Sequence, residues 1–243
     1  MMQNYLPGQL ENSTKMMVFK VLLEETVKLG DKMLLFSQSL FTLNIIEEFL
    51  QQTVIPGRSE KWMLNQSYYR LDGSTTGLER EKLISEFNAN PAVPLFLVST
   101  RAGSLGVNLV GANRVLVFDA SWNPCHDTQA VCRVYRFGQQ KPCFIYRLVT
   151  DNCLERRIYD RQLKKQSMSN RIVDETNPDN MVTTQSLNRL LDPTEDDPPP
   201  ATVAADPEKV SDPVLLTALN KLGHLFSQVS RAPLHAIAVL SRV

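Results

Sequence analysis

The sequence predicts an α/β fold built on a doubly wound parallel sheet. Short runs rich in β-branched and aromatic residues alternate with longer stretches whose apolar residues recur every three or four positions. Several of the short runs are apolar throughout, which is expected when helices cover both faces of a sheet. With 243 residues, 43% of them apolar and 21% charged, the chain can form a sizeable core.

The predicted elements follow one another as strand, helix, strand, which is the pattern of parallel sheets. The second helix shows the pattern well, since Leu43, Ile46 and Leu50 recur on one face. The five predicted strands are residues 32–37 (KMLLFS), 67–72 (SYYRLD), 95–100 (LFLVST), 114–119 (RVLVFD) and 143–149 (CFIYRLV). The five predicted helices are residues 15–29, 40–51, 77–87, 124–135 and 154–167.

Polar and glycine residues follow four of the predicted strands. The segments are FSQS, DGSTT, STRAGSLGVNL and DASWNP, in chain order. In an open parallel sheet, ligands gather at the carboxyl ends of the strands. Small hydroxyl and glycine residues there let backbone N–H groups approach a phosphate closely. Taken alone, DGST is equally a turn followed by a helix N-cap, and RAGSLG resembles a dinucleotide fingerprint only weakly.

The net charge of zero conceals two opposite halves. Residues 133–171 hold ten basic and three acidic side chains, so this stretch could meet a polyanion or form a solvated basic helix. Residues 174–212 hold ten acids against two basic residues, and the proline-rich part from 192 to 212 is predicted to be a disordered linker.

Four cysteines without a C-x-x-C pair, and the lone His126, predict neither a disulfide framework nor a metal site. No apolar run reaches the ~18 residues that a membrane span needs, and the first residues lack the features of a signal peptide, so we expect an intracellular protein.

The last segment, residues 213–243, is predicted to be an amphipathic helix. Pro213 suits its first turn, and apolar residues stand at 215, 219, 222, 226 and 229. These apolar residues are expected to be buried either by a partner protein or by packing on the chain's own lobe. Upstream, Leu187 to Leu191 fits the L-x-x-L-L pattern by which short helices dock into nuclear-receptor grooves, and such short matches also arise by chance.

The segment QAVCRVYRFGQ, residues 129–139, places Arg133 and Arg136 one turn apart on the predicted helix. Like charges at this spacing repel, so the pair calls for an anionic partner or for exposure to solvent.

Together and in this order, the four strand-end motifs and QAVCRVYRFGQ resemble the second, C-terminal RecA-like lobe of superfamily-two helicases of the SWI/SNF translocase type. The resemblance covers residues 12–177. Most members have Asp where Cys132 stands and His where Tyr135 stands; the C-R-V-Y-R form resembles the ATRX-like subgroup, which includes an androgen-receptor-interacting remodeller.

The resemblance implies a site for ATP and a site for DNA. It makes Arg133 and Arg136 arginine fingers that reach the γ-phosphate, with Gly106, Asn108 and Gln129 on the nucleotide side. It places the hydroxyl-rich strand ends against the phosphates of one DNA strand, a contact that reads no bases. The implied DNA contacts are Ser37, Gln38, Asp72, Gly73, Ser74, Ser99, Thr100, Arg101, Trp122 and Asn123.

The chain holds no G-x-x-x-x-G-K-[ST] phosphate loop, so Mg²⁺ and the nucleotide phosphates would be held by a separate first lobe. We therefore expect half of a double-stranded DNA translocase of the nucleus, acting on DNA or nucleosomes, inactive alone, and bound to no membrane. The alternatives are a non-catalytic chromatin interaction module and a strand-separating helicase. The expected units are a lead-in (1–13), the helicase lobe (14–152), a brace helix and extension (153–191), the linker (192–212) and the terminal helix (213–243).

Overall fold

The computed structural model describes residues 9–103, 108–123, 125, 132–173, 211–232 and 235–240. The strands are β1 (Met33–Ser37), β2 (Tyr68–Leu71), β3 (Leu95–Ser99), β4 (Arg114–Val117), β5 (Phe144–Thr150), β6 (Phe226–Ala232) and β7 (His235–Leu240). The helices are η1 (Leu10–Asn12), α1 (Thr14–Lys28), α2 (Leu40–Gln52), α3 (Gly77–Ala89), α4 (Thr100–Gly103), α6 (Leu154–Val173), α8 (Pro213–Leu222) and η3 (Gly223–Leu225).

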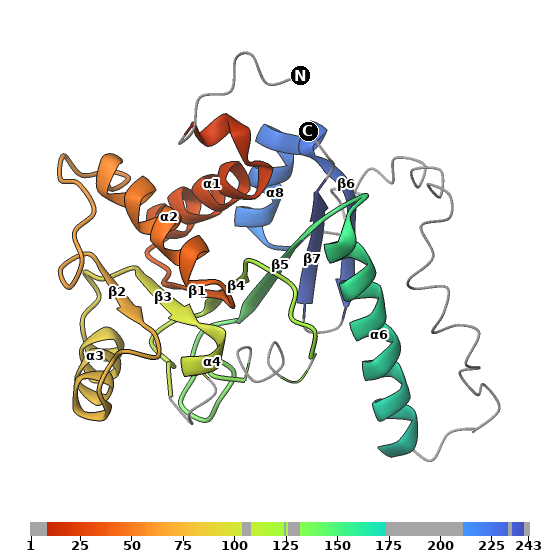
Figure 1. Ribbon diagram of the computed structural model, residues 1–243. Coiled ribbons are helices and arrows are strands. Elements are labelled where there is room, and N and C mark those ends of the chain that lie inside the picture. The colour runs from red at the N-terminus through yellow and green to blue at the C-terminus, as the bar shows by residue number, and fades with distance from the viewer. Residues whose placement is uncertain are drawn as a thin grey trace.

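One sheet carries these strands, in the order β2-β3-β1-β4-β5-β7-β6 (Figure 1). Every neighbouring pair is parallel except β6 and β7, which are antiparallel. All five residues of β1 and all five of β3 are buried, as expected for strands with helices on both faces. The predicted doubly wound α/β fold and its first five strands are confirmed.

Helices cover the two faces of the sheet as two separate layers (Figure 1). On one face, α1, α2 and α8 pack against the sheet through residues such as Phe19, Leu43 and Leu215, which are 0–3% exposed. On the other face, Leu83 and Phe87 of α3 pack with Phe96 and Val115. The burial of these apolar side chains is the main source of the fold's stability.

The first three α-helices begin where the sequence supplies a hydroxyl side chain as N-cap. The side chains of Ser13, Ser39 and Thr76 accept hydrogen bonds from the backbone N–H groups of the helices that follow them, α1, α2 and α3. Each bond satisfies one of the N–H groups that a helix start leaves unpaired. These caps explain why the predicted helix starts lie within one residue of those observed.

A buried polar network joins the amino ends of β4 and β5 to the last part of the chain. Arg114, 1% exposed, donates hydrogen bonds to Asp31, Asp212 and the hydroxyl of Tyr146. Tyr146 also donates to Asp212, and burial together with the Asp212 charge raises the pKa of Tyr146 well above its usual value. Asp212 was expected in a disordered linker, but it is 5% exposed and forms the N-cap of α8.

The predicted terminal helix is wrong beyond Leu222. Helix α8 begins at Pro213, as expected, but one 3-10 turn follows it, and residues 226–232 and 235–240 form β6 and β7. Strand β7 pairs in parallel with β5, so this segment extends the sheet. Phe226 and Val229, which the helical stripe had included, both pack against the same core cluster as α8. A register shift between Phe226 and Gln228 interrupts the alternation of side chains in β6, so these two residues can share one face although they stand three positions apart.

The predicted helix over residues 124–135 does not extend to Tyr135: Cys125 is helical, but residues 132–135 are not. Cys132, Arg133 and Val134 lie in turns, and Tyr135 lies in a bend. Arg133 and Arg136 therefore lie on a turn, not one helical turn apart on a common face. Residues 124 and 126–131 of this predicted helix lie outside the described residues.

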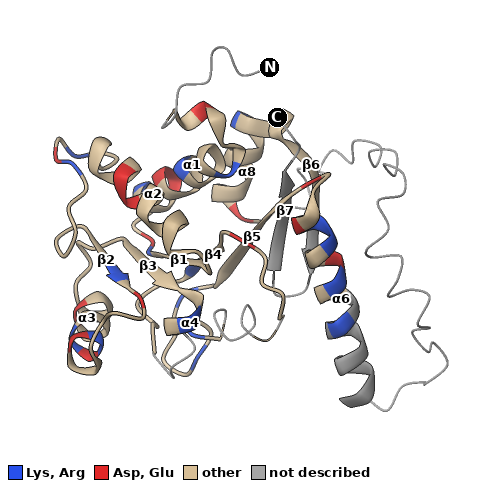
Figure 2. Ribbon diagram, in the orientation of Figure 1, with Lys and Arg blue, Asp and Glu red and all other residues tan. Residues whose placement is uncertain are grey.

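Helix α6 leaves the carboxyl end of β5 and extends away from the sheet (Figure 1). Its first turns rest on the lobe through Tyr159, which packs with Val149 and Ala120. Basic residues recur along its described part, as Figure 2 shows. No helix within the described ranges is both long and apolar enough to cross a membrane.

Candidate functional site

The sheet order brings four polar strand ends side by side at one edge. Strands β2, β3, β1 and β4 are neighbours and parallel, so their carboxyl ends share one edge of the sheet. The segments predicted to carry the site follow these four strands. The sheet thus assembles residues that are distant in the chain, such as Ser37 and Asp119, which stand 82 positions apart.

Asp119 joins the ends of β1 and β4. Its carboxylate accepts a hydrogen bond from the hydroxyl of Ser37 and one of 2.9 Å from the backbone N–H of Gln38. The amide of Gln38 also donates to the carbonyl of Ala120 at 2.8 Å. Ser37 is fully buried, so its hydroxyl fixes the strand end from inside, whereas Gln38 is exposed. Asp119 was not among the predicted site residues. It could have been found as the acidic residue that ends the apolar run RVLVFD.

The end of β2 forms a tight polar turn. Asp72 accepts hydrogen bonds from the backbone N–H of Ser74 at 2.9 Å and from its hydroxyl at 2.6 Å. The hydroxyl of Ser74 and the guanidinium of Arg70 lower the pKa of Asp72. Gly73 and Ser74 are exposed, so their backbone faces solvent at the edge of the sheet. The turn thus presents Gly73 and Ser74 at the surface, with both donors of Ser74 engaged by Asp72.

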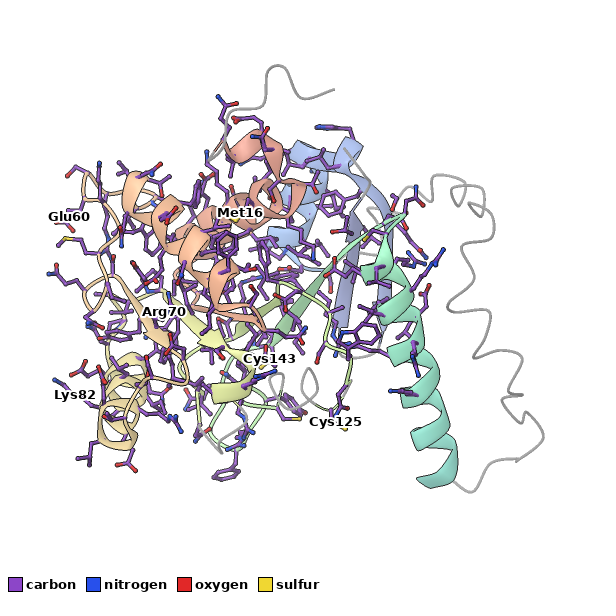
Figure 3. The ribbon with its side chains drawn as sticks, in the orientation of Figure 1. Met16, Glu60, Arg70, Lys82, Cys125 and Cys143 are labelled. Carbon is purple, nitrogen blue, oxygen red and sulfur yellow. The ribbon has the colours of Figure 1, made fainter. Side chains whose placement is uncertain are left out.

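Arg70 ties this turn to helix α2. Its guanidinium pairs with Glu47 and donates to Asn44 at 2.7 Å, while Nε donates to Asp72 at 3.0 Å (Figure 3). The side chain therefore holds β2 and α2 together at the site. No local pattern in the sequence indicated Arg70, because its partners on α2 stand more than 20 positions away.

The ends of β3 and β4 hold the remaining predicted DNA contacts. Ser99 and Thr100 are buried, and Arg101 is exposed at the start of α4. After β4, Trp122 is 58% exposed, and Asn123 is exposed and accepts a hydrogen bond from the backbone of Cys125 at 3.1 Å. Of the ten predicted DNA contacts, Gln38, Gly73, Ser74, Arg101, Trp122 and Asn123 are exposed.

A compact turn, residues 132–139, presents the two arginines. Nε of Arg136 donates to the carbonyl of Cys132 at 2.9 Å, and the carbonyl of Arg133 accepts from Leu109 at 3.1 Å. The amide of Gln139 donates to the carbonyls of Ala112 and Val110 at 2.7 and 3.1 Å. Gly138 has a φ of 100°, a conformation that suits glycine. The turn is thus tied to the segment before β4 at several points.

The turn gives its members very different environments. Arg133 is 6% exposed; burial lowers its pKa, and the positive charge of Arg136 lowers it further. Tyr135 and Phe137 flank Arg136 and are 67% and 104% exposed. Arg133 and Arg136 thus lie close enough for each charge to act on the other.

The predicted nucleotide residues are only partly described. Asn108 is exposed, and its carbonyl accepts a hydrogen bond from the Asn88 amide of α3 at 2.9 Å. The backbone of Gly111 donates to the same Asn88 side chain at 2.9 Å. A Cβ on Gly111 would lie 2.8 Å from the Cα of Asn88, so only glycine fits there. Gly106 and Gln129 lie outside the described residues.

Known proteins resemble this chain in sequence and in fold. Residues 14–138 match the family model described as the helicase conserved C-terminal domain. "Helicase ARIP4" of Mus musculus is 55% identical over 237 residues, which cover 94% of this chain and 16% of that protein; the Xenopus tropicalis form is 53% identical over 236 residues, covering 93% and 17%. "Transcriptional regulator ATRX" of Homo sapiens is 47% identical over 194 residues, covering 74% and 8%.

A solved structure supports the same relationship. The structure titled "Crystal structure of the C-terminal part of Fun30 ATPase domain" is 35% identical, with a TM-score of 0.56, and the match covers 64% of this chain and 47% of that one. The chain spans about one sixth of the length of the ARIP4 relatives.

Proposed function

Because this chain belongs to the helicase conserved C-terminal domain family and resembles the ATRX-like group of SWI/SNF-type proteins, we propose that it is the second lobe of an ATP-driven translocase on double-stranded DNA. In this proposal a first lobe holds ATP and Mg²⁺, and this chain supplies arginines and DNA-backbone contacts. The activity belongs to a protein that contains both lobes.

One observation carries the proposal: the turn 132–139 holds Arg133 and Arg136 close enough for their charges to interact. Two neighbouring guanidinium groups can both donate to the charge that develops on a transferred phosphoryl group. Asn108, Gly106 and Gln129 line the same nucleotide on this side in the proposal.

The proposed DNA contacts are of the kind that grips a backbone without reading bases. Gly73 offers a backbone N–H group after β2, and Trp122 and Asn123 are exposed after β4. Ser37, Asp72, Ser99 and Thr100 support this surface from below, since each is at most 9% exposed. A motor that steps along any DNA needs such sequence-independent contacts.

The proposed setting is chromatin in the nucleus, because the relatives include a protein named as a transcriptional regulator. The proposed partners are duplex DNA or nucleosomes, a first ATPase lobe, and a nuclear receptor bound through Leu187 to Leu191. That receptor segment lies outside the described residues.

The test uses Arg133→Lys and Arg136→Lys in a two-lobe protein that contains this chain. Lysine keeps the charge but loses the planar fork, so DNA-stimulated ATP hydrolysis should fall by roughly 10³ to 10⁵, with DNA affinity nearly unchanged. Arg157→Lys, on the exposed face of α6, is the control and should leave both quantities unchanged. Near-normal hydrolysis by both variants would refute the finger role and favour a non-catalytic interaction module.

A further inference from the structure

Arg147 is a buried arginine with two donors that no described residue uses. It lies in the middle of β5 and is 4% exposed. Its Nε and Nη2 atoms are buried and make no hydrogen bond to any part of the chain that the structure describes. Most buried polar groups in folded proteins are paired, so these two donors require an explanation.

Arg147 lies on the face of the sheet that also receives the arginine turn. Along β5, Ile145 packs in one cluster with Val115 and Val134, and Val149 packs with Ala120 and Tyr159. Since side chains alternate along a strand, Arg147 points to the same face as Ile145 and Val149. Val134 belongs to the turn 132–139, so Arg147 lies on the face of the sheet against which that turn packs.

The register places Arg147 near the site edge of the sheet. It is level with Val117, the last residue of β4, and with Ile237 of β7. Asp119, which joins β1 and β4, follows Val117 by two residues. Arg147 therefore lies close to the strand ends that form the candidate site. It is on the face of the sheet that α3 covers.

The two available donors form one binding edge. Nε and Nη2 are neighbours on the planar guanidinium, and together they match two oxygens of one anion in a bidentate pair. Arginine does not lose its charge in proteins, so burial cannot neutralise Arg147. A buried charge without a partner is strongly unfavourable, which means that an anion fits this position well.

The acids at this edge are engaged elsewhere. Asp119 binds Ser37 and Gln38, Asp151 binds Arg156 and Ser227, and Glu155 binds Lys15. Val134, between Arg133 and Arg136 in the turn, packs in the same cluster as Ile145, so the charges of the turn lie on the same face of the sheet as Arg147. Positive charge gathered on one face favours a multiply charged ligand, such as a phosphate, over a single carboxylate.

We propose that Arg147 is the anchor of a buried phosphate-binding site at the carboxyl edge of the sheet. The proposal does not rest on the proposed motor function, because inorganic phosphate can be tested on this chain alone. Free phosphate and the phosphate of a nucleotide share the chemistry that Arg147 recognises.

The experiment follows thermal unfolding of the chain with inorganic phosphate, with potassium chloride holding the ionic strength constant. At phosphate about a hundredfold above its Kd, the melting temperature of the natural chain should rise by about 5 °C or more. Arg147→Met should fold with an equal or higher melting temperature without phosphate and show no such rise. Arg147→Lys, which keeps the charge and loses the fork, should show less than half of it.

Arg157→Met is the matched control, because Arg157 is an exposed arginine on α6. It should keep the full response, which shows that the response does not depend on an exposed arginine; the general stabilisation by phosphate salts is the rise that Arg147→Met still shows, and it is subtracted. An equal rise for Arg147→Met and the natural chain would overturn the proposal; if that variant does not fold, an undiminished rise for Arg147→Lys would do so.

Two further ligands complete the design. Potassium acetate that raised the melting temperature as much as phosphate, and only with Arg147 present, would overturn the phosphate assignment in favour of a carboxylate. ATP that produced the rise as well would support a nucleotide as the source, and a rise with inorganic phosphate alone would support a free anion.

Discussion

Arg114 and Asp212 stand 98 positions apart, yet Nη1 of Arg114 donates a hydrogen bond of 2.9 Å to Oδ1 of Asp212. Both residues are at most 5% exposed. The same carboxylate accepts hydrogen bonds from the backbone of Val214 and Leu215, which start α8. A single carboxylate thus ties the centre of the sheet to the segment that supplies β6 and β7.

Replacing Asp212 should therefore destabilise the whole lobe. Asp212→Ala leaves Arg114 with one buried charge partner fewer and removes the N-cap of α8, so the free energy of unfolding should fall by about 3 to 5 kcal/mol. Urea denaturation followed by circular dichroism measures this. Asp160→Ala is the control, because that side chain is 45% exposed and its ion pair with Arg156 is worth at most ~1 kcal/mol. Equal losses for the two variants would contradict the role of Asp212.

Asp119 and Ser37 should be energetically coupled. Asp119→Ala should lower the free energy of unfolding by about 1 to 3 kcal/mol, because it leaves the buried Ser37 hydroxyl with only the longer hydrogen bond to the Ser39 carbonyl, at 3.3 Å. Ser37→Ala should cost less, and the double variant should be less destabilised than the sum by about 0.5 kcal/mol or more. Simple additivity in a double-mutant cycle would show that the two side chains do not interact.

Gly111 should tolerate no side chain. Gly111→Ala places a Cβ 2.8 Å from the backbone of Asn88, so we expect a loss of about 1 to 3 kcal/mol. Gly77, at the start of α3, has no described atom within 4 Å of the position that a Cβ would take, and Gly77→Ala should be neutral or stabilising by up to ~1 kcal/mol. Thermal unfolding of the two variants makes the comparison, and a neutral Gly111→Ala would mean that the α3 contact is loose.

Acid should weaken the fold through Asp72. Hydrogen bonds from Ser74 and Arg70 hold the pKa of Asp72 below its usual 3.8, so the folded state binds the proton less readily than the unfolded state. Its stabilising contribution is therefore complete above about pH 4 and is lost as pH falls through the folded pKa. Glu25, whose pKa is lowered by Lys28 and Lys221, acts in the same direction. Urea denaturation between pH 7 and pH 3 should show a smaller decrease for Asp72→Asn; an unchanged pH profile would exclude this role.

The chain alone should bind DNA weakly and should not hydrolyse ATP. Its sequence holds no phosphate loop, so turnover should stay at background with or without DNA. Duplex binding should be independent of sequence and should weaken steeply with salt, as counterions are released from the phosphates. Fluorescence anisotropy at several salt concentrations measures this. DNA-stimulated hydrolysis by the chain, or affinity that salt leaves unchanged, would contradict the half-motor interpretation.

Local sequence predicted the first five strands almost to the residue. The run predicted at 95–100 is observed as β3 over Leu95–Ser99, and the run at 114–119 as β4 over Arg114–Val117. These strands are buried on both faces, so an uninterrupted apolar run identifies them without knowledge of their partners. Helix starts were equally accurate where a hydroxyl N-cap marked them.

What the sequence did not reveal depends on partners far along the chain. Strand β7 pairs with β5 across about 90 positions. No local pattern in the sequence shows that β5 has a free hydrogen-bonding edge to which a later strand can add. For the same reason Phe226 and Val229 could be read as a helical stripe. In the candidate site, the sequence did not predict which side chains are exposed to solvent. Ser37 was predicted to contact DNA, but it is buried and its hydroxyl donates to Asp119. Arg147 gave no signal, because its strand reads as an ordinary buried run.

The late position of β6 and β7 in the chain has a consequence for synthesis on the ribosome. The first five strands have been made once residue 150 is translated, but β7 needs about 90 more residues. At ~5 to 20 residues per second, that interval lasts about 5 to 20 seconds. During it, the hydrogen-bonding edge of the apolar strand β5 has no covering strand, and Arg114 lacks Asp212. A nascent chain of this kind is prone to pair with other chains, so its yield in cells should depend on chaperones that shield that edge.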